Sequence, residues 1–166
     1  MKEFTITKPR TSNGYSIHRA VAALTQGAPH HWRDNGKTLT IRTTAPLDAE
    51  GADLPTVRMG ELRLFDLRAC VASKVRGRHV YPPRGDHKAR QAWLGKQGQR
   101  YGFEVVAVHC TSQPARVADQ AGRDFTLDAT DFTGVLKVTD SAAFESALKT
   151  GVGATGRAFG FSLLSI

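Results

Sequence analysis

Hydrophobic and polar residues follow strand-like and helix-like periods in the first part of the chain. Residues 4–8 (FTITK) alternate and predict a strand. Residues 14–27 carry an apolar stripe with helical spacing, and Gly27 is the expected helix end. The stripe consists of Ile17, Ala20, Val21 and Leu24, with Ser12 or Asn13 as the expected N-cap. Residues 29–34 and 37–43 read as strands around Asn35-Gly36, a dipeptide typical of a tight hairpin.

The remaining patterns predict further strands and two more helices. Residues 45–60 contain two prolines and two glycines and predict a loop rather than a helix. Strands are expected at 61–74, 103–112 and 158–166, and one or two strands at 125–140. Helices are expected at 87–102 and at 141–150, the second with Ser141 as N-cap.

This order of elements predicts an α+β fold. The second half reads strand, helix, strand, strand, helix, strand, which is the ferredoxin-like order, and the first half reads as the same unit without its second helix. We therefore expect two tandem ferredoxin-like (RRM-like) domains with antiparallel sheets, the first one reduced, at residues 1–66 and 67–166. A basic valley between two open sheets suits RNA.

The segment GVGATG at 151–156 fits the G-x-G-x-x-G template of a dinucleotide-binding loop. That template binds a pyrophosphate when it follows a strand and opens a helix, whereas here a helix precedes the glycines and a strand follows them. A helix C-cap and tight connection is the better interpretation, yet a C-cap needs a single glycine. The other glycines and Arg157 indicate close approach of the backbone to another group.

Composition and cysteine usage narrow the class of protein. With 40% hydrophobic and 23% charged residues, the chain of 166 residues is typical of a globular protein. The first ten residues lack the apolar stretch of a signal peptide, which predicts a cytoplasmic location. Cys70 and Cys110 stand alone in the sequence, so buried thiols are expected rather than a disulfide framework or a zinc site.

The positive charge of the chain is concentrated in one segment. Residues 68–100 hold nine Lys and Arg and a single acid, Asp86, so their surplus equals the net charge of +8 of the whole chain. Such a concentration predicts a polyanionic partner, above all nucleic acid. Anionic lipid is disfavoured because prolines and glycines interrupt the segment and prevent a clean amphipathic helix.

Tyr15, His18 and Arg19 form a polar group on the predicted first helix. Tyr15 and His18 are three residues apart and therefore adjacent, and Ala22 leaves open space beside them. Histidine exchanges protons readily near neutral pH. Spacing alone leaves open whether this group is functional or an ordinary solvated face.

Three segments carry a resemblance to a known family: YSIHRAVAAL, GELRLFDLRA and FTGVLKVTDSAAFESALKTGVGATGRAFGFSLLSI. They resemble the CRISPR-associated CasE family, the crRNA-processing endoribonuclease of Cascade-type (type I-E) systems. The resemblance implies two ferredoxin-like domains and a glycine loop that packs beside RNA. It also implies cleavage of the precursor transcript at the base of each repeat hairpin, without metal or other cofactor.

The resemblance also implies roles for individual residues. His18 matches the catalytic histidine and Tyr15 the tyrosine beside it, while Arg19 can add charge if it points inward. The expected products are a 2′,3′-cyclic phosphate and a 5′-hydroxyl. The expected partners are the repeat hairpin RNA (crRNA) and other subunits of a CRISPR effector complex, with no membrane and no direct DNA contact. The implied RNA-binding residues are Arg76, Arg78, Arg84, Lys88, Arg90, Arg116, Arg123, Gly151, Gly153 and Arg157.

Departures from the family pattern leave alternatives open. The chain is shorter than typical members, its glycine loop has an extra residue, and Ser162 replaces the usual last glycine. One alternative is a subunit that binds the repeat RNA without cutting it; another is a small enzyme acting on phosphorylated metabolites. A metal site at His30 and His31 is weaker still, because adjacent residues of a strand face opposite ways.

Overall fold

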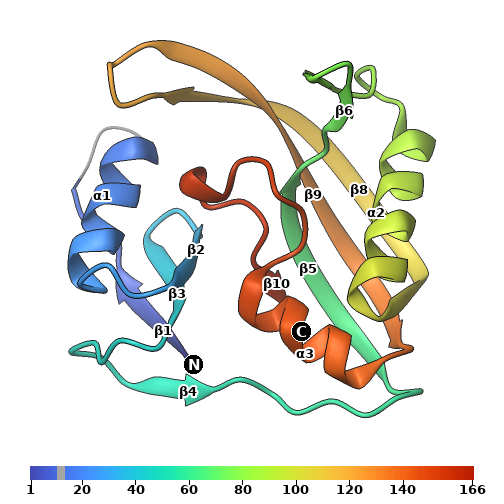
Figure 1. Ribbon diagram of the computed structural model, residues 1–166, viewed down its shortest axis with the longest axis horizontal. Coiled ribbons are helices and arrows are strands. Elements are labelled where there is room, and N and C mark those ends of the chain that lie inside the picture. The colour runs from blue at the N-terminus through green and yellow to red at the C-terminus, as the bar shows by residue number, and fades with distance from the viewer. Residues whose placement is uncertain (11–13) are drawn as a thin grey trace.

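The computed structural model describes residues 1–10 and 14–166, so the expected N-cap at Ser12 or Asn13 lies outside the described residues. The first half of the chain contains one helix beside four strands (Figure 1). In order these are β1 (Lys2–Thr7), α1 (Gly14–Leu24), β2 (His30–Asp34), β3 (Thr38–Thr43) and β4 (Gly51–Asp53). The strands pair antiparallel in the order β2-β3-β1-β4, and Asn35-Gly36 forms the turn of the predicted hairpin.

The second half forms a larger sheet with two long helices. Its elements are β5 (Leu62–Cys70), β6 (Ser73–Val75), β7 (Arg78–Val80), α2 (His87–Tyr101), β8 (Phe103–Ala118), β9 (Asp124–Val138), α3 (Ser141–Thr150), the short 3-10 helix η1 (Arg157–Phe159) and β10 (Leu164–Ser165). The main sheet has the antiparallel order β10-β5-β9-β8, and β6 with β7 makes a separate small hairpin.

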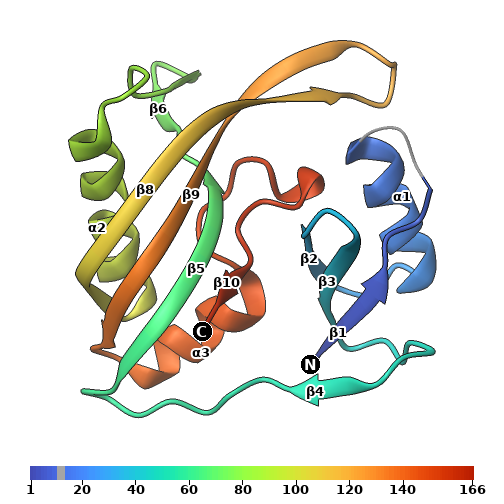
Figure 2. The same cartoon turned by 180° about the vertical axis from the view of Figure 1, so that it is seen from behind.

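The predicted fold class is confirmed. In the first domain β1 and β3 are central, with β4 beside β1 and β2 beside β3. In the second domain β5 and β9 are central, with β10 beside β5 and β8 beside β9. This is the strand order of two ferredoxin-like domains. No helix is described between β3 and β4, so the first domain is the reduced one. The two domains lie side by side in both views (Figures 1 and 2).

Several predicted boundaries are corrected. The expected loop at 45–60 contains β4, and the expected strand at 158–166 is reduced to β10 after η1. β8 and β9 are longer than predicted and form an arm that reaches over α1 (Figures 1 and 2). The division predicted after residue 66 falls within β5, all of which pairs in the second sheet. We propose that the division lies at 54–61.

Side-chain and glycine caps set the ends of α2 and α3. Asp86 accepts a hydrogen bond from the Ala89 amide at the start of α2, and Gly102 ends this helix in the left-handed conformation. Asp140, rather than the expected Ser141, caps α3 by accepting from the Ala143 amide. An aspartate is as good a cap as a serine, so the predicted helix was right and its cap one residue late.

Each domain has its own core. In the first domain Ile17 and Val21 of α1 pack with Trp32, Leu39 and Ile41 of the sheet. Leu24, which the stripe had placed inside, is 45% exposed. The larger core of the second domain contains Phe144, Ala147 and Leu148 of α3. Cys70 and Cys110 are buried free thiols, as expected.

The contacts that join the two domains include a close ring–backbone approach, a hydrogen bond and an ion pair. Trp32 lies against Gly160, the residue after η1, at a distance that leaves no room for a Cβ atom on that glycine. The buried Arg42 donates to the Leu148 carbonyl of α3 at 2.8 Å and pairs with Glu3 at 2.6 Å. Arg33 forms an ion pair with Asp66 of β5 at 2.7 Å.

Arg90 is buried and is not available to RNA, which corrects its predicted role. Its side chain is 0% exposed. Its guanidinium donates to both carboxylate oxygens of Asp128, at 2.8 and 2.7 Å, and to the Thr130 hydroxyl at 2.7 Å. An arginine held on both edges of its fork by buried acceptors is part of the fold.

We expect Gly160→Ala to destabilise the protein more than the matched control Gly36→Ala. Both glycines have left-handed backbones, with φ of +81° and +88°. Each substitution should cost roughly 1 kcal/mol for that conformation. A Cβ at residue 160 would also lie 2.7 Å from the Trp32 ring, whereas one at residue 36 meets nothing within 4 Å. Overpacking should add roughly 1–3 kcal/mol. Urea unfolding measures the free energy of unfolding of both variants. Equal losses of stability would show that the Trp32 ring moves aside at no cost.

We expect Arg90→Met to lower the free energy of unfolding by roughly 3–5 kcal/mol, because it leaves the Asp128 carboxylate without its buried partner. Arg84→Met is the control, since Arg84 is exposed on the same side of the domain. Its effect should stay within about 0.5 kcal/mol. Denaturant unfolding of both variants measures the difference, and similar small losses would contradict a structural role for Arg90.

Candidate active site and nucleic-acid interface

Tyr15 and His18 are neighbours on the first two turns of α1. Their ring centroids are 6.2 Å apart, with the planes tilted by 45°. Ile17 and Val21 bury one stripe of the helix in the domain core, and this fixes where around the helix the two rings lie. The geometry predicted for the pair is therefore present.

The His18 side chain is half-buried, and its Nδ1 atom has no hydrogen-bond partner within the described chain. Burial lowers the pKa of His18, and the nearby positive charge of His30 lowers it further. His18 is consequently neutral at pH 7. A neutral imidazole can accept a proton, which is what a general base requires.

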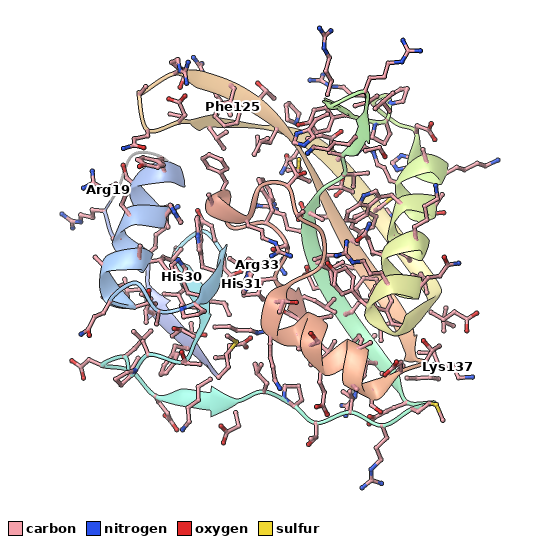
Figure 3. The ribbon with its side chains drawn as sticks, in the orientation of Figure 1. Arg19, His30, His31, Arg33, Phe125 and Lys137 are labelled. Carbon is pink, nitrogen blue, oxygen red and sulfur yellow. The ribbon has the colours of Figure 1, made fainter. Side chains whose placement is uncertain are left out.

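His30, at the start of β2, is a third member of this group that the sequence analysis missed. Its ring centroid lies 5.9 Å from that of His18, and Figure 3 shows it beside α1. Residues i and i+2 of a strand share a face, and Trp32 faces α1 in the core. His30 stands two residues before the apolar Trp32, and this spacing was the sequence signal that its side chain faces α1.

His31 faces the other side of β2 and has different surroundings. Burial lowers its pKa to about 4, with further contributions from the charges of Arg157, His30 and Arg42. It is therefore neutral near pH 7. Across residues 1–10 and 14–166, no group of three His, Cys, Asp or Glu side chains is placed to hold a metal ion.

Arg19 does not join the group. It is exposed, and Figure 3 shows it on the outer side of α1, away from the second domain. The inward orientation that its predicted role required is absent. Arg19 directly follows His18 on the helix, so its side chain points about 100° around the helix axis from that of His18. The two side chains therefore face different ways.

The arm of β8 and β9 brings a second set of predicted residues to α1. Arg116 lines a hollow of about 270 Å³ together with Gly14 and Ile17 of α1. It is highly exposed and pairs with Asp124 at 2.6 Å, while Arg123 pairs with Asp119 at 2.7 Å near the tip. Phe125 of the arm contacts Phe159 of η1 edge to face, with 5.5 Å between ring centroids.

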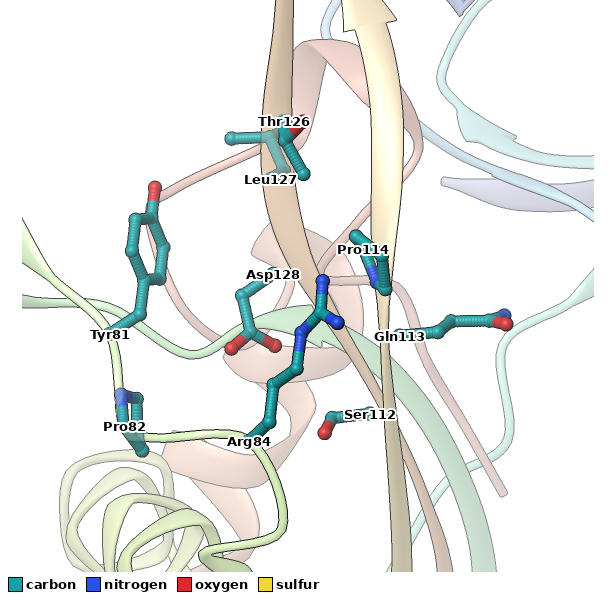
Figure 4. Close-up of a pocket in the computed structure, with 9 residues that line it drawn as sticks. All are labelled: Tyr81, Pro82, Arg84, Ser112, Gln113, Pro114, Thr126, Leu127 and Asp128. Carbon is teal, nitrogen blue, oxygen red and sulfur yellow. The ribbon is translucent and has the colours of Figure 1, made fainter.

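Most of the charge of the basic segment lies on the surface of the β6–β7 hairpin and α2. Arg76, Arg78, Arg84 and Lys88 are all exposed, as their predicted role requires. Arg84 lines a hollow of about 240 Å³ next to Tyr81 and Pro114 (Figure 4). Arg68 differs, because its guanidinium holds both oxygens of Asp131 at 2.7 and 2.9 Å.

The glycines of the 151–156 loop approach the protein itself, and contact of their backbone with RNA stays a prediction. Gly151 and Gly153 are buried. A Cβ at Gly151 would lie 2.8 Å from the Ser162 hydroxyl oxygen, and one at Gly153 would lie 3.3 Å from the Trp93 ring. Arg157 is exposed, and its Nε donates to the Gly153 carbonyl at 2.9 Å.

One face of this glycine loop nevertheless borders a basic hollow. Residues 153–156 line a space of about 460 Å³ together with Lys74, His79 and Arg100. Ser162, where the family pattern has glycine, has φ of +91°, a conformation that glycine adopts more easily. No described helix is long and apolar enough to cross a membrane.

Comparison with solved structures finds the same fold over the whole chain. A CRISPR endoribonuclease Cse3 bound to a 19-nucleotide RNA is 21% identical, with a TM-score of 0.83 and 99% of each chain covered. The CRISPR-associated protein Cas6e of Escherichia coli K-12 is 18% identical, with a TM-score of 0.81 and coverage of 99% and 98%. A chain of a CRISPR RNA-guided surveillance complex is 17% identical, with a TM-score of 0.79 and the same coverage.

No curated protein matches the sequence. Residues 4–166 match the family described as CRISPR associated protein, which is nearly the entire chain. The family expected from the three resembling segments is thereby confirmed: the chain belongs to the CRISPR associated protein family.

Proposed function

We propose that this chain is an endoribonuclease that cuts precursor CRISPR RNA at the base of the repeat hairpin and keeps hold of the product. The reaction is attack of an RNA 2′-hydroxyl on the adjacent phosphate. It leaves a 2′,3′-cyclic phosphate and a 5′-hydroxyl and needs no metal. Family membership supports this function, as do structural neighbours that include an RNA-bound CRISPR endoribonuclease and a chain of a surveillance complex.

The observation that carries this function most directly is the pairing of Tyr15 with a neutral His18 on α1. A 2′-hydroxyl is a weak nucleophile until a base takes its proton, and His18 is in the form that can do so. Tyr15, one turn earlier, can orient the phosphate or the nucleophile through its hydroxyl group. The arrangement therefore suits phosphate transesterification.

The pentacoordinate transition state carries extra negative charge, which nearby cations must stabilise. Arg19 faces outward, so we assign this role to the arm instead. Arg116 reaches the hollow beside the first turn of α1, and its partner Asp124 is exposed. An exposed ion pair of this kind is weak and exchanges readily for a phosphate contact.

We propose that the RNA stem runs from α1 past the arm to the β6–β7 hairpin and the start of α2. Arg116 and Arg123 of the arm, and the exposed Arg76, Arg78, Arg84 and Lys88, lie along that path. Both views show the arm spanning the distance between α1 and the hairpin (Figures 1 and 2). Arg157 adds an exposed cation on η1, between the domains.

His18→Ala should bind a cognate repeat hairpin as the parent does but cleave it on the order of 10²-fold more slowly or worse, because a positioned acid–base group is lost. Tyr15→Phe should lose less, since the ring remains. EDTA should leave every rate unchanged. Single-turnover cleavage with excess protein measures the chemical step without slow product release. If the parent binds several hairpins yet cuts none, the chain is a non-catalytic repeat-binding subunit.

Replacing Arg76, Arg78, Arg84 and Lys88 by alanine should flatten the salt dependence of RNA binding. Each lost phosphate contact should reduce the log–log slope by about 0.7–0.9. The matched control replaces four exposed cations outside the proposed path: Lys2, Arg58, Lys137 and Lys149. Figure 3 places Lys137 far from the hairpin. Titrations of labelled hairpin RNA at several salt concentrations give the slopes of both variants. If both variants reduce the slope equally, the RNA interface is not the proposed path.

A further inference from the structure

His30 is held in one orientation by two hydrogen-bond acceptors. Its Nδ1 lies 2.9 Å from the Ala28 carbonyl oxygen and 3.0 Å from the Thr25 hydroxyl oxygen. A carbonyl oxygen can only accept, so Nδ1 must carry a hydrogen. In the neutral ring the proton-accepting nitrogen is therefore Nε2, which lies on the side of the ring away from these two partners.

The support of His30 belongs to the same helix that carries His18. Thr25 is fully buried directly after the end of α1, and its hydroxyl lies 3.0 Å from the Val21 carbonyl and 3.3 Å from the Ala22 carbonyl of that helix. Because these carbonyls occupy the hydroxyl hydrogen, the Thr25 oxygen is left to accept from His30. Both histidine rings are thus positioned by α1, which fixes their spacing at 5.9 Å.

This support does not depend on the charge of His30. Nδ1 bears a hydrogen in both the neutral and the protonated ring, so the ring can gain or lose a proton at Nε2 without breaking either hydrogen bond. That is the behaviour of a reusable proton donor. His18 differs, since its Nδ1 is buried without a partner and its charged form is disfavoured.

We propose that His30 is the general acid of the cleavage reaction and His18 its general base. The 2′-oxygen forms a bond to phosphorus as its proton passes to His18. The bond from phosphorus to the 5′-oxygen breaks as Nε2 of protonated His30 gives that oxygen its proton. Water then returns one proton to His30 and takes one from His18, which restores the site. This inference rests on the proposed function and names the residue that protonates the leaving group.

The surrounding charges are consistent with such a division. Tyr15 of α1 lies beside His18, whereas the charges of Arg157 and Arg42 act on His31, which faces the other side of β2. His31 stays neutral because its pKa is about 4, and Arg42 is paired with Glu3. Burial and the positive charge of His30 both lower the pKa of His18, so a protonated His30 favours a neutral His18 beside it.

The test compares an ordinary RNA hairpin with one whose leaving 5′-oxygen is replaced by sulfur. A thiolate leaves without protonation, because thiols are far more acidic than alcohols. The variant is His30→Asn, whose side-chain amide can still donate to the Ala28 carbonyl and keep the local structure. His109→Gln, on the exposed surface of β8, is the control for loss of a histidine. His18→Ala is the comparison for loss of the base.

In single turnover, His30→Asn should cut the oxygen substrate on the order of 10²-fold more slowly than the parent. It should cut the sulfur substrate within about threefold of the parent rate, while His18→Ala stays slow on both. The parent rate should rise with pH as His18 loses its proton. In His30→Asn this rise should move to higher pH, because burial still lowers the His18 pKa but the added effect of the His30 charge is gone.

Equal losses of His30→Asn on both substrates would overturn the acid assignment and leave His30 a structural support. An undiminished rate on the oxygen substrate would overturn any role of His30, while the proposed cleavage would stand. If the parent cuts neither substrate although it binds both, the proposed function and the His30 role fall together. Far-UV circular dichroism and hairpin binding of each variant check that the fold and the RNA interface persist.

Discussion

The contact between the Trp32 ring and the backbone of Gly160 is the constraint on which the arrangement of the two domains depends. Trp32 belongs to the core of the first domain, and Gly160 ends the turn that carries η1 from the second domain. A side chain on residue 160 would have to overlap the ring, so the close approach requires glycine. Through this contact η1 and Arg157 come to lie beside α1, and the arm follows because Phe125 packs on Phe159.

The basic residues divide into those that hold the fold and those that remain free. Arg42, Arg68 and Arg90 each face a carboxylate at 2.6–2.9 Å. Arg42 and Arg90 are buried, where an unpaired charge would be costly, and Arg68 is partly exposed. The cations on the β6–β7 hairpin and the outer face of α2 remain exposed to water. A single stretch of sequence therefore supplies both the internal ion pair at Asp128 and the outward field that attracts a polyanion.

The proposed site places two histidines in different electrostatic settings on one helix scaffold. His18 has a buried Nδ1 without a partner, whereas the Nδ1 of His30 has two acceptors that suit either charge state. Acid–base catalysis needs two groups, one that takes a proton and one that gives a proton. The separation of roles comes from the turn after α1, where Thr25 and Ala28 meet the start of β2.

The sequence by itself determined the family, through the three resembling segments. It also determined the strand and helix order and the Tyr15–His18 pair, because these depend on local periodicity and on spacing within one helix. Only the tertiary structure decided that Arg90 is internal, that Gly151 and Gly153 pack against their own protein and that His30 joins His18. Each of these depends on which segment lies opposite: Asp128 for Arg90, Trp93 for Gly153, and α1 for His30. Such pairings join residues distant in the chain, and a local pattern carries no information about them.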